Sequence, residues 1–221
     1  MNLSKDTLDL LGNFATINSN VVLKPGQKLK TISEAKNIMA IADIVEDFPK
    51  DMGIYDLNEF LATHSLVEDA QLVFEDNAVV IKNNTNTVRY FFAEPSILTS
   101  PDKDVTMPEC EVQITLTEEV LAQLRRAASV LGHIDIAFIG NDQLTLKVFD
   151  SKDASANTFE IDLGPNTTGH KFEFAMNIAN LKFVDGEYEV FISSKLISKW
   201  VHKTKNVTYF VALEKTSSFG V

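Results

Sequence analysis

The sequence has little of several features on which whole classes of protein depend. It contains one cysteine, Cys110, which excludes an internal disulfide and fits a reducing compartment. No apolar run approaches the ~20 residues that a membrane-spanning helix needs. Residues 1–6 lack both a basic leader and an apolar stretch, so a signal peptide is not expected. We therefore expect no membrane partner and a location in a reducing compartment.

Motifs that carry chemistry are also missing. The sequence has no glycine-rich phosphate loop, no paired cysteine ligands and no His-Glu-x-x-His helix. The carboxylates Asp150 and Asp153 are more typical of a solvated loop than of a glycosidase pair. Cys110 has no histidine near it in the sequence to activate a thiolate. The histidines show no spacing typical of a metal site; they are His64, His133, His170 and His202. We expect no enzyme activity, no cofactor and no metal.

Positive charge is in deficit, with 20 Lys and Arg against 31 Asp and Glu and a net charge of −11. The phosphate backbone repels such a chain, so tight binding to DNA by counterion release is not expected. The basic stretch from Lys195 to Lys205 is interpreted as an exposed strand kept soluble by lysines, with a DNA or partner patch as the alternative. Arg125 and Arg126 leave a solvated helix face and a binding face equally open.

What the sequence does contain is one series of elements that occurs twice. Residues 4–17 and residues 117–131 both have the i, i+3, i+4 apolar spacing of an amphipathic helix. Ser4 and Thr117, which align when Leu3 is matched with Leu116, are suited to cap these helices. Each helix is followed by short strands, a second short helix and three more strands. The second helices are expected at residues 57–64 and 177–182.

The strand pattern predicts antiparallel sheets in both halves. Strands are expected at residues 21–23, 28–32, 38–45, 52–55, 71–74, 79–82 and 87–92, and again at 112–114, 134–139, 143–149, 158–163, 171–175, 188–194, 197–202 and 207–213. Prolines interrupt residues 94–110, which we interpret as a connector that lies on a surface. The sequence thus predicts a duplicated α+β architecture, with domains at 1–93 and 111–221 joined by the connector 94–110.

Five segments together carry a resemblance to a known family. They are Leu-Ser-Lys-Asp-Thr at 3–7, Asn-Phe-Ala-Thr-Ile-Asn-Ser at 13–19, Ile-Tyr-Asp-Leu-Asn at 54–58, Asn-Ile-Ala-Asn-Leu-Lys at 177–182 and Tyr-Phe-Val-Ala-Leu-Glu at 209–214. In this order, over almost the whole chain, they resemble the DNA polymerase sliding clamps of T-even-type bacteriophages. The resemblance implies a duplicated DNA-clamp fold, with two helices in each domain packed on antiparallel sheets and the chains assembled as a ring.

The same resemblance implies a function without chemistry. A homotrimeric ring would encircle duplex DNA without sequence specificity and tether the replicative DNA polymerase for processive synthesis. An ATP-driven clamp loader is the implied second partner, late-transcription factors are a further one, and the implied location is the cytoplasm of the infected host bacterium. A closed ring is held by topology and needs little affinity, which reconciles DNA with the negative net charge.

Site residues follow from the resemblance by position. Helices at 4–17, 57–64, 117–131 and 177–183 are expected to face DNA, with phosphate contacts from Lys5, Arg125, Arg126 and Lys182. Gly12 departs from the family, in which a lysine is expected there. The strand 87–92 is expected to meet 158–163 of a neighbouring subunit through Val88, Tyr90, Phe92, Phe159 and Ile161. Partner peptides are expected near the connector, at Leu98, Val105 and Met107.

Two other classes of protein stay open at this point. A phage tail or capsid protein would share the β-rich pattern and the lack of catalytic motifs, but it does not call for paired helices. An enzyme with an unrecognised carboxylate site is the third possibility. The oligomeric state is the observation that best separates the three.

Overall fold

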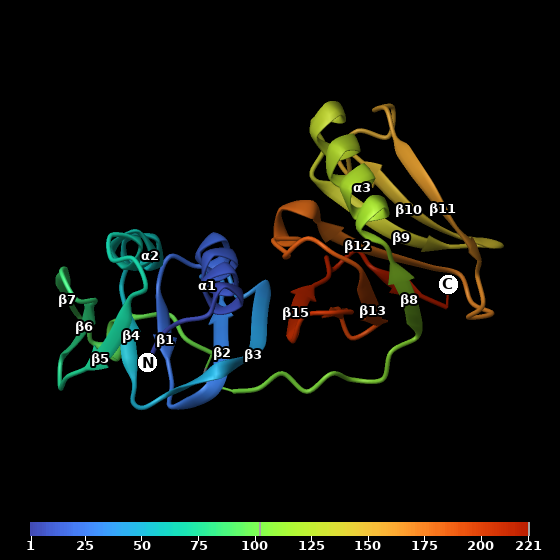
Figure 1. The fold of residues 1–221 in the computed structure, drawn as a ribbon. Coiled ribbons are helices and arrows are strands. Elements are labelled where there is room, and N and C mark those ends of the chain that lie inside the picture. Colours follow the sequence, from blue (N-terminus) through green and yellow to red (C-terminus); the bar gives the residue numbers. More distant parts are fainter. Residues whose placement is uncertain (102, 221) are drawn as a thin grey trace. The chain divides into compact units, whose positions relative to one another are not determined.

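The structure, a computed structural model, describes residues 1–101 and 103–220. It divides into two compact units, Met1–Asp104 and Val105–Val221 (Figure 1). The predicted connector and second domain each include one residue outside the described part, Asp102 and Val221 respectively. The predicted domain limits at 1–93, 94–110 and 111–221 stay a prediction.

Two helices of the first unit pack side by side (Figure 1). The helix α1 (Lys5–Ile17) begins where the Ser4 side chain accepts a hydrogen bond from the backbone N–H of Thr7, which satisfies one unpaired donor of the first turn. Helix α2 (Leu57–Ser65) begins in the same way at Asp56. Both helices bury the apolar side chains that their spacing placed on one face, including Leu11, Phe14 and Phe60.

Seven strands complete the first unit. They are β1 (Val21–Leu23), β2 (Gly26–Ile32), β3 (Ile38–Phe48), β4 (Met52–Ile54), β5 (Gln71–Phe74), β6 (Ala78–Lys82) and β7 (Thr87–Phe91), followed by the 3-10 turn η1 (Pro95–Ile97). In the described residues these strands pair with one another in antiparallel fashion: β1 with β4, β2 with β3, and β6 with both β5 and β7. Within the described residues β7 pairs on one side only, so it is an edge strand.

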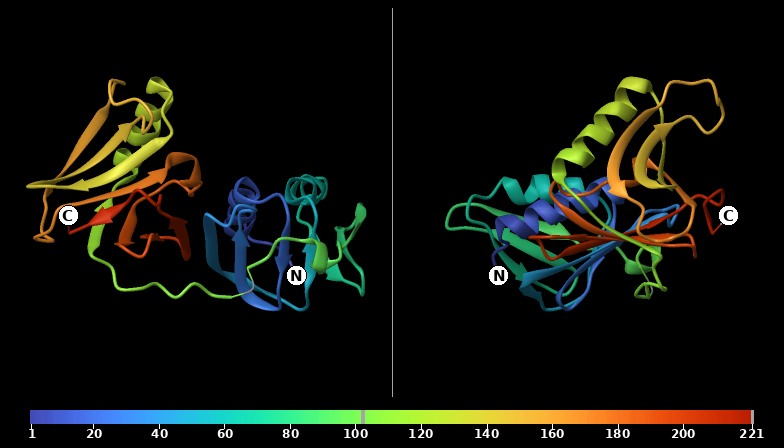
Figure 2. Two further views of the ribbon diagram at one scale, coloured as in Figure 1. Left: turned by 180° about the vertical axis from the view of Figure 1, so that it is seen from behind. Right: turned by 90° about the vertical axis from the view of Figure 1, so that its right-hand side faces the viewer.

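In the second unit the long helix α3 (Glu118–Leu131) packs against a five-stranded sheet. Its elements are β8 (Val112–Leu116), α3 (Glu118–Leu131), β9 (Asp135–Gly140), β10 (Gln143–Phe149), β11 (Phe159–Pro165), β12 (Phe172–Asn177), η2 (Ile178–Asn180), β13 (Tyr188–Ser193), β14 (Ile197–His202), β15 (Val207–Ala212) and β16 (Ser218–Phe219). One sheet has the order β11-β10-β9-β12-β16, and β15-β14-β13-β8 follow one another in a second. In both views of Figure 2 the yellow-green helix α3 lies against strands of its own unit, and its main strand contacts are with β10.

The strand pairing confirms the duplication that the sequence predicted. The pair β2/β3 corresponds to β10/β11, and the pair β1/β4 corresponds to β9/β12. The series β5-β6-β7 corresponds to β13-β14-β15. Even the pairing of β8 with β13 has a counterpart, because Met1 and Leu72 of β5 exchange two backbone hydrogen bonds. Thr117 caps α3 through Val120 as Ser4 caps α1 through Thr7.

The expected second helix of the second domain, at residues 177–182, is wrong. Only the single 3-10 turn η2 forms there, so the described part of the chain has three α-helices. Leu181 and Phe183 are both buried, at 4% and 6% exposure, while Lys182 between them is exposed. Buried positions two apart fit an extended chain, because an α-helix would place them roughly 200° apart around its axis. Packing of these two side chains therefore overrides the helical pattern.

The connector is held at both ends by hydrogen bonds, and its described residues after η1, 98–101 and 103–110, form no helix or strand. In the first unit the Thr99 N–H donates to the Asn20 side chain at 2.9 Å. In the second unit the Ser193 hydroxyl donates to the Glu109 carbonyl at 2.6 Å. Among the described helices none is long and apolar enough to cross a membrane.

Candidate functional site

Lys5, the cation expected to face DNA from α1, forms an ion pair with Asp9 of the same helix. Lys5 is exposed, and its Nζ lies 2.5 Å from Oδ2 of Asp9 one turn later. That hydrogen bond, with the negative charge of Asp9, raises the pKa of Lys5 above its usual value. Gly12 lies on the same outward face, and a Cβ placed there would meet nothing within 4 Å. On the outward face of α1, therefore, the expected cation Lys5 is paired with an acid, and Gly12 presents no side chain.

The two arginines of α3 have different surroundings. Counting about 100° per residue, Arg126 lies opposite the buried positions Leu124 and Ala128, whereas Arg125 lies on the flank. Arg126 is exposed, and no hydrogen bond or ion pair within the described residues engages it. Arg125 donates to Oδ1 of Asp185 at 3.0 Å and to the carbonyl of Leu181 at 3.1 Å.

Lys182 is exposed, as expected, but it does not lie on a helix. It lies after η2 in a segment without regular structure, between two buried residues, and so is not part of a DNA-facing helix. Helix α2 adds no lysine or arginine: its exposed positions include Glu59, and the basic residue in its last turn, His64, is half-buried. The cations of the predicted site are thus unevenly divided, with Lys5 alone in the first unit.

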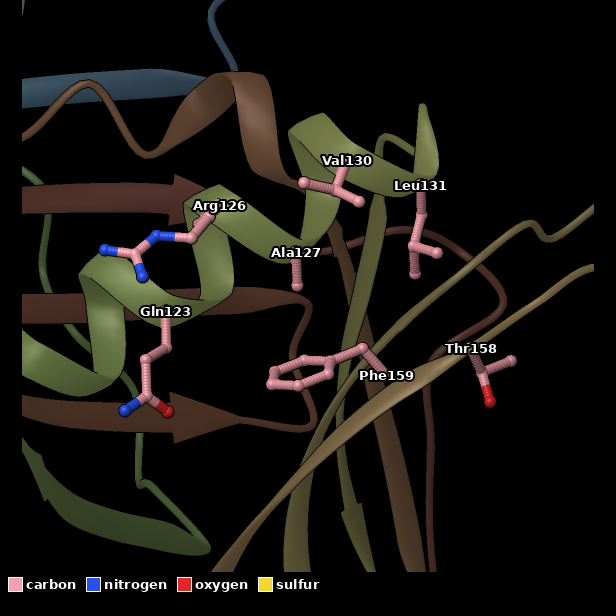
Figure 3. A pocket seen from close by; sticks show the side chains of 7 residues that line it. All are labelled: Gln123, Arg126, Ala127, Val130, Leu131, Thr158 and Phe159. Atoms are coloured by element: carbon pink, nitrogen blue, oxygen red, sulfur yellow. The ribbon is translucent and has the colours of Figure 1, made fainter.

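A pocket of about 370 Å³ lies between α3 and the start of β11 (Figure 3). Figure 3 shows the methyl group of Ala127 pointing toward the ring of Phe159, while the Arg126 guanidinium extends away from that ring. Val130 at the rim is 79% exposed and Phe159 is 36% exposed. β11 pairs with β10 alone within the described residues, so this apolar pocket adjoins an edge strand. Ile161, the other residue expected on this edge, is half-buried.

The edge strand β7 presents a projecting aromatic side chain in place of a pocket. Of the three residues expected to face a neighbour, Tyr90 instead packs within its own unit, with its ring 5.3 Å from Phe60 and its hydroxyl 3.4 Å from the Asp56 carbonyl. Val88 and Phe92 are half-buried. Phe91, which the sequence analysis left out, is 61% exposed on the other face of the strand. Alternation along the strand puts Phe91 and Tyr90 on opposite faces, but only the position of α2 shows which is covered.

The three residues expected to hold partner peptides also differ from one another. Leu98 is 9% exposed, and its Cδ1 lies 3.1 Å from where a Cβ on Gly53 would be. It is therefore part of the first unit's packing and offers little free surface. Val105 and Met107 are half-buried. Peptide binding at this segment stays a prediction.

No group of three or more His, Cys, Asp or Glu side chains within the described residues is placed to hold a metal ion. Burial raises the pKa of the Cys110 thiol, which disfavours the thiolate that a nucleophile needs. The thiol instead donates to the Pro108 carbonyl at 3.3 Å.

Comparison with known proteins assigns both halves of the chain. Residues 4–97 match the family described as DNA polymerase processivity factor, and residues 113–215 match the family described as gp45 sliding clamp, C terminal. The sliding clamp of Enterobacteria phage T4 is 33% identical over 99% of this chain and 99% of its own length. The sliding clamp of Vibrio phage KVP40 is 31% identical over 97% of this chain and 99% of its own.

A solved structure extends the likeness to the fold at low identity. A. fulgidus PCNA, solved bound to the C-terminal region of FEN-1, is 14% identical with a TM-score of 0.68, covering 96% of both chains. The clamp fold predicted from the sequence is confirmed, and the tail or capsid alternative is set aside because the phage relatives are sliding clamps. The chain belongs to the sliding-clamp family of DNA polymerase processivity factors.

Proposed function

We propose that three copies of this chain close into a ring around duplex DNA and that the ring tethers the replicative polymerase. The observation that carries this is the pair of unlike edges in one chain: β7 presents the exposed Phe91, and β11 adjoins the apolar α3–β11 pocket. Two unlike surfaces give a head-to-tail contact, which closes into a ring when the rotation between copies allows it.

The pocket and the ring of Phe91 are matched in character. The pocket, with a volume of about 370 Å³, has room for an aromatic side chain, and its walls include Ala127, Val130 and Phe159. An aromatic side chain centred in such a contact is a common source of binding energy between proteins. Pairing the edges of β7 and β11 would also cover two strands that otherwise invite aggregation.

Charge supports a contact with DNA that is weak and independent of sequence. The net charge of −11 opposes tight binding, while Arg126 offers one exposed cation per chain on the outward face of α3. Phosphate contacts position a protein on DNA without reading its sequence. Weak contacts permit sliding, and closure of the ring prevents dissociation.

The partners of the ring are proposed by analogy with the family. An ATP-driven loader would open the ring, the polymerase would bind one face through a peptide near Val105 and Met107, and late-transcription factors would use the same ring. The site of action would be the cytoplasm of the infected host bacterium, since the relatives at 31% and 33% identity are phage proteins.

Two experiments test the proposal. Sedimentation at micromolar concentration should give a closed trimer, and a monomer or an extended filament at every concentration would contradict the ring. Primer extension with the cognate polymerase and loader should give longer products on circular DNA than without the clamp. On linear DNA the gain should disappear, and blocking both ends should restore it. No gain on circular DNA would contradict tethering.

A further inference from the structure

The segment between β12 and β13 has no α-helix, so its backbone N–H and C=O groups need other hydrogen-bond partners. It corresponds in chain order to α2 of the first unit, but after η2 the chain leaves helical conformation at Leu181 (φ −82, ψ 54). In an α-helix the carbonyl of residue 181 would accept from the N–H of residue 185. Outside a helix that donor is not in place, and an unsatisfied carbonyl in a partly buried place is costly.

Arg125 supplies the missing interaction from the neighbouring helix. Its Nη2 donates to the Leu181 carbonyl at 3.1 Å, and its Nη1 donates to the Asp185 carboxylate at 3.0 Å. One guanidinium therefore joins the two residues that a helical hydrogen bond would have joined. The planar fork of arginine suits this double contact, and the single ammonium of lysine does not.

Other side chains fix the remainder of the segment. The Tyr188 hydroxyl donates to the Val184 carbonyl at 2.5 Å, and a ring nitrogen of His202 lies 3.1 Å from the Asp185 carbonyl. The Phe183 ring packs 4.5 Å from that of Tyr209. An open surface pocket of about 510 Å³ lies between α3 and η2, with Arg125 and Leu181 among the residues that line it. Arg125 thus joins α3 to the segment beside a solvent-open pocket.

We infer that Arg125 is a positioning residue, which fixes the segment 181–185 and the exposed Lys182 within it, and that Arg126 is the phosphate contact of α3. The inference rests on the proposed DNA-facing role of α3. Arg125 shares its charge with Asp185 and is 34% exposed, whereas Arg126 lies opposite the buried face with no acid beside it in the described residues. Two adjacent arginines therefore have different tasks.

The test compares Arg125→Gln, Asp185→Asn and Arg126→Gln by hydrogen exchange on the purified protein. Amides of residues 181–187 should exchange at least tenfold faster in Arg125→Gln and Asp185→Asn, and at the wild-type rate in Arg126→Gln. Arg125→Lys keeps the positive charge but should not restore protection. Wild-type exchange in both Arg125→Gln and Asp185→Asn would overturn the positioning role.

The second readout is the salt dependence of processive synthesis on circular DNA. Arg126→Gln should lower the slope of retention against the logarithm of salt by about one for each phosphate that the variant no longer neutralises. Arg125→Gln and Asp185→Asn should change retention in the same direction, because both release the same segment. Opposite signs would overturn the inference, since Asp185→Asn would then have freed a DNA-binding arginine. If α3 does not face DNA, Arg126→Gln changes nothing while the exchange result stands.

Discussion

The hydroxyl of Thr7, in the first turn of α1, donates a 2.5 Å hydrogen bond to the buried carboxylate of Glu46 on β3. The same carboxylate accepts from the backbone N–H of Ser4. In a capping box the acid that binds the N-cap N–H comes from the helix itself, three residues after the cap. Here that position is Thr7, and the acid comes from a strand, so the start of α1 is tied to the sheet.

Glu46→Gln should make the free energy of unfolding less dependent on pH in the acid range. Burial opposes ionisation of Glu46, but the hydrogen bonds from Thr7 and Ser4 outweigh it and hold its pKa below the usual 4.5. A lowered pKa contributes stability above pH ~4.5 that is lost as pH falls through the folded-state value. At pH 7 we expect the variant to lose about 1–3 kcal/mol, with the difference shrinking by pH 3.

The measurement is thermal unfolding of both proteins between pH 3 and 7. Glu34→Gln, which changes an exposed carboxylate, is the matched control and should leave the curve unchanged. Equal pH dependence in wild type and Glu46→Gln would show that the Thr7–Glu46 contact does not stabilise the ionised form.

Phe91→Ala should weaken assembly without loosening its own unit. Phe91 is 61% exposed and contributes little to packing within the chain. Removal of an aromatic anchor costs about 2 kcal/mol or more, roughly 30-fold in association. Sedimentation equilibrium should show the shift toward monomer, with the melting temperature of the monomer unchanged.

Tyr90→Ala provides the contrast to Phe91→Ala. Its ring packs on Phe60 within the unit, so the free energy of unfolding should fall by about 2–3 kcal/mol. Tyr90→Phe keeps the ring and should behave nearly as wild type in urea unfolding. If Tyr90→Ala weakened assembly and Phe91→Ala did not, the assignment of the two faces of β7 would be reversed.

Gly12→Lys should strengthen retention on DNA. Gly12 lies on the outward face of α1 with open space where a side chain would begin. One more cation per chain should raise the salt slope of retention by up to about one per phosphate reached. Gly12→Ala is the control: it should stabilise the helix by about 0.5–1 kcal/mol without changing the slope. An equal slope for both variants would place α1 away from DNA.

Gly53→Ala should be destabilising where Gly12→Ala is stabilising. A Cβ on Gly53 would stand 2.2 Å from the Ala93 carbonyl oxygen, a backbone atom that cannot rotate away. The backbone at Ala93, just after β7, would have to shift, at a cost of about 1–3 kcal/mol. Urea unfolding of the two variants checks both signs, and unchanged stability of Gly53→Ala would show that this close approach is not required.

The sequence predicted the features that depend on local residue pattern, such as helix caps and strand limits. Ser4 and Thr117 are suited to N-caps, and both cap helices. Strands with clear alternation, such as residues 143–149, have the predicted limits. The pattern at residues 177–182 failed because helical spacing and buried alternate residues conflict, and tertiary packing around Leu181 and Phe183 decided the outcome.

Side-chain roles were less predictable than elements. Arg125 and Arg126 look alike in the sequence, since the carboxylate that distinguishes them, Asp185, lies 60 residues later. The choice between Tyr90 and Phe91 depends on Phe60 of α2, which no local pattern contains. Roles fixed by contacts distant in sequence need the folded chain to be seen.

The unlike edges of the chain give an assembly with polarity. A chain with Phe91→Ala keeps its pocket, and a chain with Ala127→Trp, whose pocket is filled, keeps its projecting phenylalanine. Each variant alone should assemble weakly, because all three contacts are damaged, and an equal mixture should stop at a heterodimer joined through one intact contact. In an excess of wild type either variant becomes a chain terminator, and because a trimer has three positions, a small mutant fraction should leave about three times that fraction of rings open.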